Sequence, residues 1–184
     1  MDLTGKRVAL LVEEEYQELE VWYPNLRLQE AGATVVTIGS GRKTTFGSKL
    51  GYPIDADKSA DEVSADEFDA VIVPGGFAPD YMRLSQPMVD LVKNAYEDGK
   101  LVASICHGGW MLVSAGAVKG RRATGYDPIR VDVENAGGTW VDEEVVIDDN
   151  VITSRTPPDL PAFAREIVRY LAEAQTSKRA AAAE

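Results

Sequence analysis

Short, continuously apolar segments alternate with helical ones along most of the chain, and this order limits the folds that the chain can adopt. Apolar runs rich in β-branched residues occupy residues 6–13, 33–39, 69–76 and 101–105. The spacing of apolar residues predicts helices over residues 17–32, 86–100, 108–120 and 158–174. Strands without a polar face are typical of a parallel sheet that is covered by helices on both sides. The sequence therefore predicts one α/β domain over residues 1–174, with a mainly parallel sheet.

Four further segments carry local predictions. Residues 143–155 predict a β-hairpin, with two β-rich runs joined by an Asp-Asn turn. Residues 52–69 predict a short strand followed by polar turns or a short helix. Pro24 falls inside the predicted helix 17–32, so we expect a kink or a late helix start. Residues 175–184 are small or polar, and we expect a flexible tail that frays or extends the last helix.

Charge and cysteine content exclude several classes of protein. The net charge of −11 disfavours stable binding to nucleic acids or to anionic membranes. The first residues have only a short apolar run before three glutamates, so we expect neither a signal peptide nor a membrane span. A single cysteine excludes an internal disulfide and favours the cytoplasm. One cysteine and one histidine are too few for a zinc site, and we expect no metal or cofactor.

The stretch LVASICHGGW holds the only cysteine and the only histidine of the chain, side by side. Cys106 follows a predicted strand and precedes a predicted helix, which is the position of a nucleophile on a tight turn. A helix N-terminus lowers the pKa of a nearby thiol, so we expect a reactive thiolate here. The alternative is a buried structural cysteine, because free cysteines are among the most buried residues. The glycines at 108 and 109 favour the nucleophile, since they remove bulk where the turn is tightest.

Other groups are expected to reach the same edge of the sheet, where the carboxyl ends of parallel strands meet. His107 is either a proton carrier or a structural residue, and it need not touch the thiol of its neighbour. Its N–H, with those of Gly75 and Gly76, is a candidate for holding an oxyanion. An acidic carboxyl near Cys106 would stay protonated, because a thiolate and a carboxylate cannot both ionise cheaply in a dry site. The candidates are the acids that follow the first strand: Glu13, Glu14, Glu15, Glu18 and Glu20.

Five separated stretches together resemble the PfpI-type branch of the ThiJ/PfpI superfamily. They are EVWYPNLRLQEAG, DAVIVPGGFAPDYMR, VASICHGGWMLVSAG, DVENAGGTWVDEEVV and ITSRTPPDL, and the resemblance covers residues 6–172. It implies a flavodoxin-like fold of the class I glutamine amidotransferase type, with the sheet sandwiched by helices and a C-terminal β-hairpin. The common family elbow reads Cys-His-Gly-Pro, whereas this chain has Gly109 in place of the proline.

The resemblance also implies roles for individual residues. Cys106 becomes the nucleophile, with His107 beside it. The family glutamate that contacts the thiol stands four residues before a proline, which here makes it Glu20, with Glu15 as the second choice. Asp80 matches a family acid that reaches the histidine of a neighbouring subunit, and Tyr126 matches a pocket tyrosine. An acid donated between subunits implies a homo-oligomer, a dimer or larger.

Three classes of function remain open on the sequence alone. The first is a stress-protective enzyme of the glyoxalase or deglycase type, in which Cys106 attacks methylglyoxal or its early adducts on proteins or nucleotides. The second is an intracellular cysteine peptidase of the PfpI type, with Asp80 orienting His107. The third is not catalytic: a sensor in which the Cys106 thiol is oxidised, or a chaperone. No residue pattern identifies the substrate.

Overall fold

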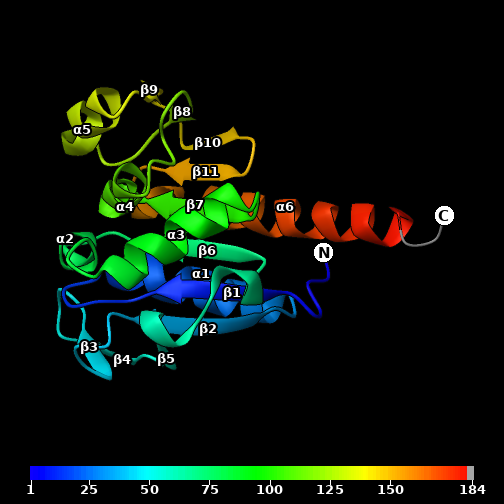
Figure 1. The fold of residues 1–184 in the computed structure, drawn as a ribbon, viewed down its shortest axis with the longest axis horizontal. Helices are drawn as coiled ribbons and strands as arrows, with labels where there is room; N and C mark the ends of the chain where they lie inside the picture. Colours follow the sequence, from blue (N-terminus) through cyan, green and yellow to red (C-terminus); the bar gives the residue numbers. More distant parts are fainter. Residues whose placement is uncertain (182–184) are drawn as a thin grey trace.

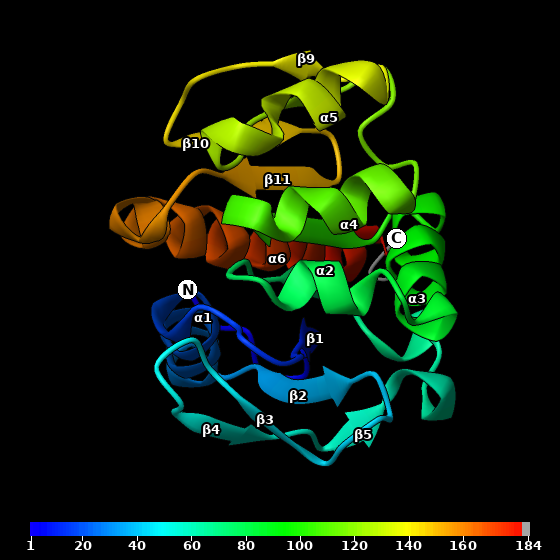
Figure 2. The same ribbon diagram turned by 90° about the vertical axis from the view of Figure 1, so that its left-hand side faces the viewer.

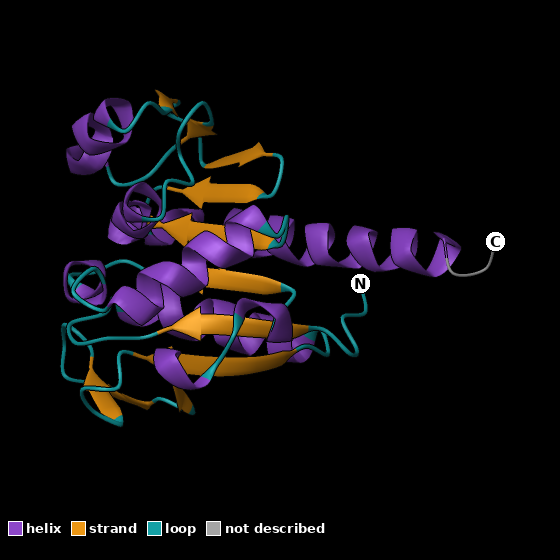
Figure 3. Ribbon diagram, in the orientation of Figure 1, coloured by secondary structure: helices purple, strands orange, loops and turns teal. Residues whose placement is uncertain are grey.

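A seven-stranded sheet forms the centre of the molecule. The structure is a computed structural model that describes the backbone of residues 1–181 and the side chains of residues 1–174. The strands lie in the order β10-β11-β7-β6-β1-β2-β5. Their bounds are β1 (Arg7–Leu11), β2 (Thr34–Gly39), β5 (Lys58–Ser59), β6 (Ala70–Val73), β7 (Leu101–Ile105), β10 (Val145–Asp148) and β11 (Val151–Ser154). All neighbours pair in parallel except β10 and β11, whose arrows point in opposite directions in Figure 3. The predicted α/β fold with a mainly parallel sheet is confirmed, and so is the β-hairpin.

Helices cover both faces of the sheet (Figures 1 and 2). Figure 2 looks along the strands and shows α1 and α6 on one side and α3 on the other, with α2 and α4 at the end that faces the viewer. The bounds are α1 (Glu18–Glu30), α2 (Ala78–Met82), α3 (Gln86–Glu97), α4 (Gly109–Ser114), α5 (Arg130–Asn135) and α6 (Leu160–Ala181). Two small sheets lie outside the main one, formed by β3 (Thr45–Gly47) with β4 (Pro53–Asp55) and by β8 (Arg122–Ala123) with β9 (Thr139–Trp140). None of the helices in the described part of the chain is long and apolar enough to cross a membrane.

The central strands are buried along their whole length. Every residue of β6 and of β7 is buried, which agrees with their uninterrupted apolar sequences. Because both faces are covered, the central strands can expose functional groups to solvent only at their ends. The carboxyl ends lie on the left in Figure 1, where α2 and α4 follow β6 and β7.

Some predicted boundaries change in the structure. The late start expected for α1 is wrong, because Gln17 caps the helix at Glu18: its side-chain oxygen accepts the Glu20 N–H at 2.9 Å. Pro24 lies inside the helix, where its ring leaves the Glu20 carbonyl without the usual N–H donor. The helix predicted over 108–120 ends at Ser114, because Gly116 takes a left-handed conformation.

The end of the chain extends the last helix, which is one of the two outcomes expected for it. The segment expected as a tail, 175–184, begins within α6, which continues to Ala181, while residues 182–184 lie outside the described residues. Figure 1 shows this helix extending past the amino-end edge of the sheet. Residues 52–69 supply β4 and β5 and then two 3-10 turns, in place of the single strand that their sequence predicts.

Candidate active site

Cys106 lies at a sharp turn between a strand and a helix. Strand β7 ends at Ile105, a 3-10 turn covers Cys106–Gly108, and α4 starts at Gly109. Cys106 has a φ of 60°, a left-handed conformation that is strained for a residue with a side chain. The turn therefore holds the thiol in one direction at the carboxyl edge of the sheet.

Gly108, the first of the two glycines after His107, is required by close packing. A Cβ added to Gly108 would overlap the carbonyl oxygen of Val73, at the end of β6. A Cβ on Gly109 would lie 2.7 Å from the side chain of Ile129. Gly109 has a φ of −55°, which a proline could also adopt, so the glycine leaves the start of α4 in the conformation that a proline would impose.

Glu20 is the acid that the fold brings to the thiol. It lies in the first turn of α1, its side chain is fully buried, and Oε2 accepts the Gly75 N–H at 2.8 Å. Oε1 is buried and has no hydrogen-bond partner among the described residues. A Cβ added to Gly75 would lie 2.7 Å from both the Cβ of Cys106 and Oε2 of Glu20, so Gly75 marks the point where these two residues meet. Burial raises the pKa of Glu20 to about 7.

The thiol does not have the lowered pKa that a helix N-terminus predicts. Cys106 is only 8% exposed, and this burial, together with the neighbouring Glu20 carboxyl, raises the pKa of the thiol to about 12. The N–H groups of Gly76 and His107 act in the opposite direction, because they donate to the sulfur, but burial outweighs them. The expectation of a thiol that ionises freely at neutral pH is therefore wrong, and the proton of Cys106 needs an acceptor.

His107 does touch the thiol. Its Nδ1 lies 3.4 Å from Sγ of Cys106, although the two residues are adjacent in sequence. Aromatic side chains surround the half-buried imidazole, with ring centroids at 4.9 Å for Tyr126, 5.0 Å for Trp110 and 6.3 Å for Phe77. Burial, with the charge of a nearby lysine, lowers the pKa of His107, so the imidazole is neutral at pH 7.

The glycine pair after β6 divides its two N–H groups between two partners. The Gly75 N–H is taken by Glu20 and is not free to hold an oxyanion, which corrects the prediction for that residue. Gly76 has a φ of 78°, and a Cβ there would lie 2.5 Å from the carbonyl oxygen of Glu15. Its N–H acts on the Cys106 sulfur, as does that of His107, so these two N–H groups are the donors that can stabilise negative charge at the sulfur.

The remaining candidate residues differ in whether they reach the cavity beside Cys106. Tyr126 lines the cavity beside His107, and its N–H donates to the Cys106 carbonyl at 3.3 Å. Glu15 is exposed and approaches the site only through its backbone, whose carbonyl accepts the Phe77 N–H. Asp80 is exposed on α2 and does not line the cavity within one subunit.

A cavity of about 460 Å³ opens over the thiol. It is lined by Gln17, Glu20, Lys49, Gly76, Phe77, Cys106, His107, Tyr126, Pro128, Thr156 and Pro157. Sequence reasoning misses Gln17 and Lys49. Gln17 has a detectable signal, since it stands directly before an acidic first helical turn, where an N-cap is expected. Lys49 has none, because it reaches the cavity from a loop whose path depends on the small β3–β4 sheet.

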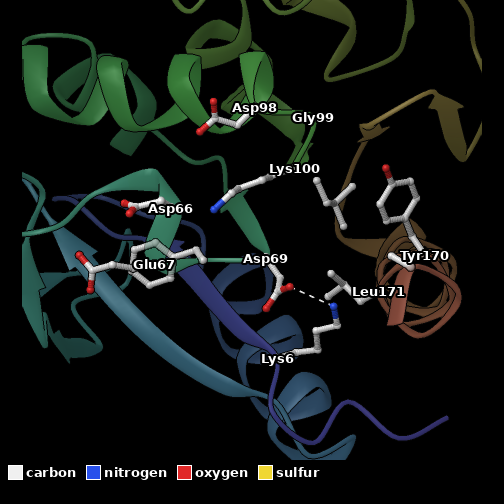
Figure 4. A pocket seen from close by; sticks show the side chains of 12 residues that line it. Lys6, Asp66, Glu67, Asp69, Asp98, Gly99, Lys100, Tyr170 and Leu171 are labelled. Carbon is white, nitrogen blue, oxygen red and sulfur yellow. Dashed lines mark hydrogen bonds and ion pairs between the residues drawn. The ribbon is translucent and has the colours of Figure 1, made fainter. Parts of the chain in front are cut away.

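A second cavity, of about 340 Å³, lies at the opposite edge of the sheet (Figure 4). Lys6, at the start of β1, is nearly buried there and forms an ion pair of 2.9 Å with Asp69. Lys100 donates to the carbonyl of Ala65, so both lysines of this cavity have partners inside the fold. Among the described residues there is no group of three or more His, Cys, Asp or Glu side chains placed to hold a metal ion.

Known proteins are similar to this chain over almost its whole length. A family model described as the DJ-1/PfpI family matches residues 6–170. A Pyrococcus furiosus protein named deglycase PfpI is 44% identical over 165 residues, which cover 90% of this chain and 99% of that protein. An Escherichia coli protein named protein/nucleic acid deglycase 2 is 44% identical over 169 residues, which cover 91% of this chain and 98% of that protein.

The fold agrees with the sequence comparison. The crystal structure of Drosophila melanogaster DJ-1beta is similar with a TM-score of 0.85 and 29% identity, over 93% of this chain and 91% of that one. The match to the family model and the identity to full-length relatives both extend well beyond the elbow around Cys106. This chain belongs to the DJ-1/PfpI family.

Proposed function

We propose that this protein is a cysteine-dependent enzyme that acts on reactive carbonyls, such as methylglyoxal or its early adducts on proteins and nucleotides. The observation that carries the proposal is the Glu20 carboxyl, buried beside the only thiol of the chain, with its pKa raised to about 7. A group that transfers protons works best when its pKa lies near the working pH. The two relatives named deglycases support the same class of substrate.

Glu20 and Cys106 act as one unit that holds a single proton near neutral pH. Burial raises the pKa of each group, and the negative charge of one disfavours ionisation of the other. The first proton leaves the pair at about pH 7. The second proton stays and can lie on the thiol or on the carboxyl. The reactive thiolate forms when this proton lies on Glu20, and the N–H groups of Gly76 and His107 stabilise the sulfur charge.

In the proposed reaction, the thiolate adds to the aldehyde carbon of methylglyoxal. A C–S bond forms, and the carbonyl oxygen takes the proton from Glu20 to give a hemithioacetal. A base then removes the hydrogen from the former aldehyde carbon while the ketone oxygen takes a proton, which gives an enediol. The neighbouring carbon is then protonated and the hydroxyl on the sulfur-bearing carbon loses its proton, which leaves a lactoyl thioester on Cys106. Water hydrolyses this thioester, which releases lactate and restores the thiol.

Two groups are placed to carry the proton between the carbons. Glu20 is again a base once it has given up its proton, and its Oε1 has no competing hydrogen bond within the described chain. His107 is the other, because its neutral imidazole lies 3.4 Å from the sulfur. The pKa of Glu20, about 7, suits a group that gives and takes protons near neutral pH.

A peptidase reaction fits this geometry less well. Peptidases with a Cys–His pair orient the imidazole with a third polar group. The candidate for that group, Asp80, is exposed and does not line the cavity within one subunit, while aromatic rings surround the imidazole. Cleavage of a peptide by the purified protein, lost in Cys106→Ser, would favour the peptidase over the carbonyl enzyme.

Lactate production from methylglyoxal tests the proposal. The wild type is expected to form lactate, and Cys106→Ala should reduce the rate to background. Glu20→Gln should lower kcat/KM by about 100-fold or more, because the amide cannot accept the thiol proton. Glu15→Gln is the matched control, since that acid is exposed and should leave the rate unchanged. Equal rates for the wild type and Cys106→Ala would overturn the proposal.

We also propose that the protein is a homo-oligomer. Three leucines support this proposal: Leu19 and Leu26 on α1 are 55% and 59% exposed, and Leu50 in the neighbouring loop is 86% exposed. Exposed apolar groups that gather on one surface are typical of contact sites between proteins. Sedimentation velocity is expected to give at least a dimer, and Leu26→Glu should shift it towards the monomer. A monomeric wild type would contradict this proposal.

A further inference from the structure

Lys49 brings a positive charge to the wall of the cavity that holds Cys106. Its Nζ lies 5.4 Å from the centre of the Phe77 ring, which places the ammonium over that ring. The loop around it is fixed by hydrogen bonds, because the Lys49 N–H donates to the Tyr16 carbonyl at 3.0 Å and Ser48 Oγ accepts the Tyr52 N–H. The fold therefore holds this lysine beside the reactive centre.

This ammonium has no ion-pair partner in the part of the chain that the structure describes. Lys43, on the loop before β3, differs because it pairs with Glu14 at 2.9 Å. Glu18 feels the charge of Lys49 without forming an ion pair with it, and its carboxylate accepts the Leu50 N–H at 2.7 Å. The charge of Lys49 nevertheless reaches the site, since it acts on both Glu20 and His107.

Gln17 adds a second donor to the same cavity. Its side-chain oxygen is used to cap α1, where it accepts the Glu20 N–H. The amide nitrogen is therefore the end of the side chain that remains available, and Gln17 lines the cavity together with Lys49. An ammonium and an amide N–H₂ group without a competing acceptor form a pair suited to an anion.

We propose that Lys49 and Gln17 bind a carboxylate on the substrate, so that the enzyme prefers carbonyl compounds and adducts that carry a carboxylate near the reacting carbon. This inference rests on the proposed function and adds the substrate class to it. A carboxylate fits better than a phosphate, because one ammonium and one amide supply few donors, whereas phosphate sites gather several. The lysine also offsets the repulsion that an ionised Glu20 exerts on an anionic substrate.

Alkylation of Cys106 tests the inference without turnover. Iodoacetate and iodoacetamide react with the same thiolate and differ in charge, so the ratio of their rates cancels the reactivity of the sulfur. Lys49→Met is expected to lower the iodoacetate to iodoacetamide ratio by about two- to fivefold, as for an exposed ion pair. Gln17→Glu should lower the ratio as well, because it keeps the capping oxygen and replaces the donor. Added salt should lower the wild-type ratio towards that of Lys49→Met.

Lys43→Met is the control, since it removes the same charge from the loop before β3, outside the cavity. It should leave the ratio unchanged. The inference is overturned if Lys49→Met also leaves the ratio unchanged, or if it changes both rates by the same factor. A ratio that depends on Lys49 in a protein that forms no lactate would support the anion site and contradict the proposed function alone.

A substrate pair extends the same test to turnover. The adduct of methylglyoxal with N-acetylcysteine carries a carboxylate, and the adduct with N-acetylcysteine amide does not. The wild type is expected to have the lower KM for the carboxylate adduct, and Lys49→Met should lose this difference. Equal KM values for both adducts in the wild type would overturn the preference.

Discussion

Substitution of Gly75 by alanine tests how closely the reactive pair is packed. The added Cβ would lie 2.7 Å from the Cβ of Cys106, 2.7 Å from Oε2 of Glu20 and 2.9 Å from the backbone nitrogen of His107. The backbone nitrogen cannot move without the elbow, so the Cys106 turn or α1 must shift. Gly75 does not have a positive φ, so the expected damage comes from contact and not from backbone conformation.

The magnitude follows from two effects. Overpacking of a buried site costs about 1–3 kcal/mol. The shift also weakens the bond from the Gly75 N–H to the Glu20 carboxyl, and a hydrogen bond to a charged group contributes about 1.5–3 kcal/mol. We expect Gly75→Ala to lower the free energy of unfolding by about 3 kcal/mol, which for a chain of this size lowers Tm by about 6–12 °C.

Thermal unfolding and lactate production measure the two consequences. Displacement of the pair by a fraction of an ångström should lower kcat/KM by about 100-fold at a temperature where the variant is folded. Gly99→Ala is the control, because Gly99 has a φ of 68° and open space around it. It should cost about 1 kcal/mol through backbone strain and leave the activity intact. A Gly75→Ala variant that matches Gly99→Ala in both Tm and activity would refute this account of the packing.

Three further predictions concern stability. The pKa of Glu20 rises from 4.5 to about 7 on folding, so the folded state keeps a proton that the unfolded state loses, and stability falls as pH rises from about 4.5 to 7. Glu20→Gln should flatten this part of the pH profile and unfold in more urea than the wild type at pH 8. An unchanged profile would contradict the cost of burying this carboxyl. Asp69→Asn leaves the nearly buried Lys6 without its counter-charge and should cost about 3 kcal/mol in urea unfolding, whereas a loss below about 0.5 kcal/mol would mean that the pair is solvated. Asn150→Ala removes the side-chain donor from the carbonyls of Tyr96 and Lys100, of which Tyr96 keeps the Gly99 N–H. It should cost about 2 kcal/mol by the same measurement, with no effect on alkylation of the thiol.

The fold was largely predictable because its main signal is local. Uninterrupted apolar runs such as β6 and β7 favour strands that are covered on both faces, and the glycine pair after His107 indicates a tight turn. The lengths of helices were less predictable. The end of α4 depends on Gly116 adopting a left-handed conformation, and glycine permits this conformation without requiring it.

The position of Cys106 at a turn between a strand and a helix was predictable, and its surroundings were less so. The choice between Glu20 and Glu15 required the three-dimensional path of α1, because both acids lie close to the end of β1 in sequence. The same path decides that the Gly75 N–H binds Glu20 and not an oxyanion. The raised pKa of the Cys106 thiol could not be anticipated from the helix N-terminus, since it results from burial and from a carboxyl that is distant in sequence.

The shared proton of Glu20 and Cys106 is the central claim, and the pH dependence of Cys106 alkylation by iodoacetamide tests it most directly. The account predicts a rate that rises with an apparent pKa near 7, and a Glu20→Gln variant in which this step is lost and the rise begins at higher pH. A profile with the step of an ordinary thiol, near pH 8.5, that is the same in both proteins would contradict the claim.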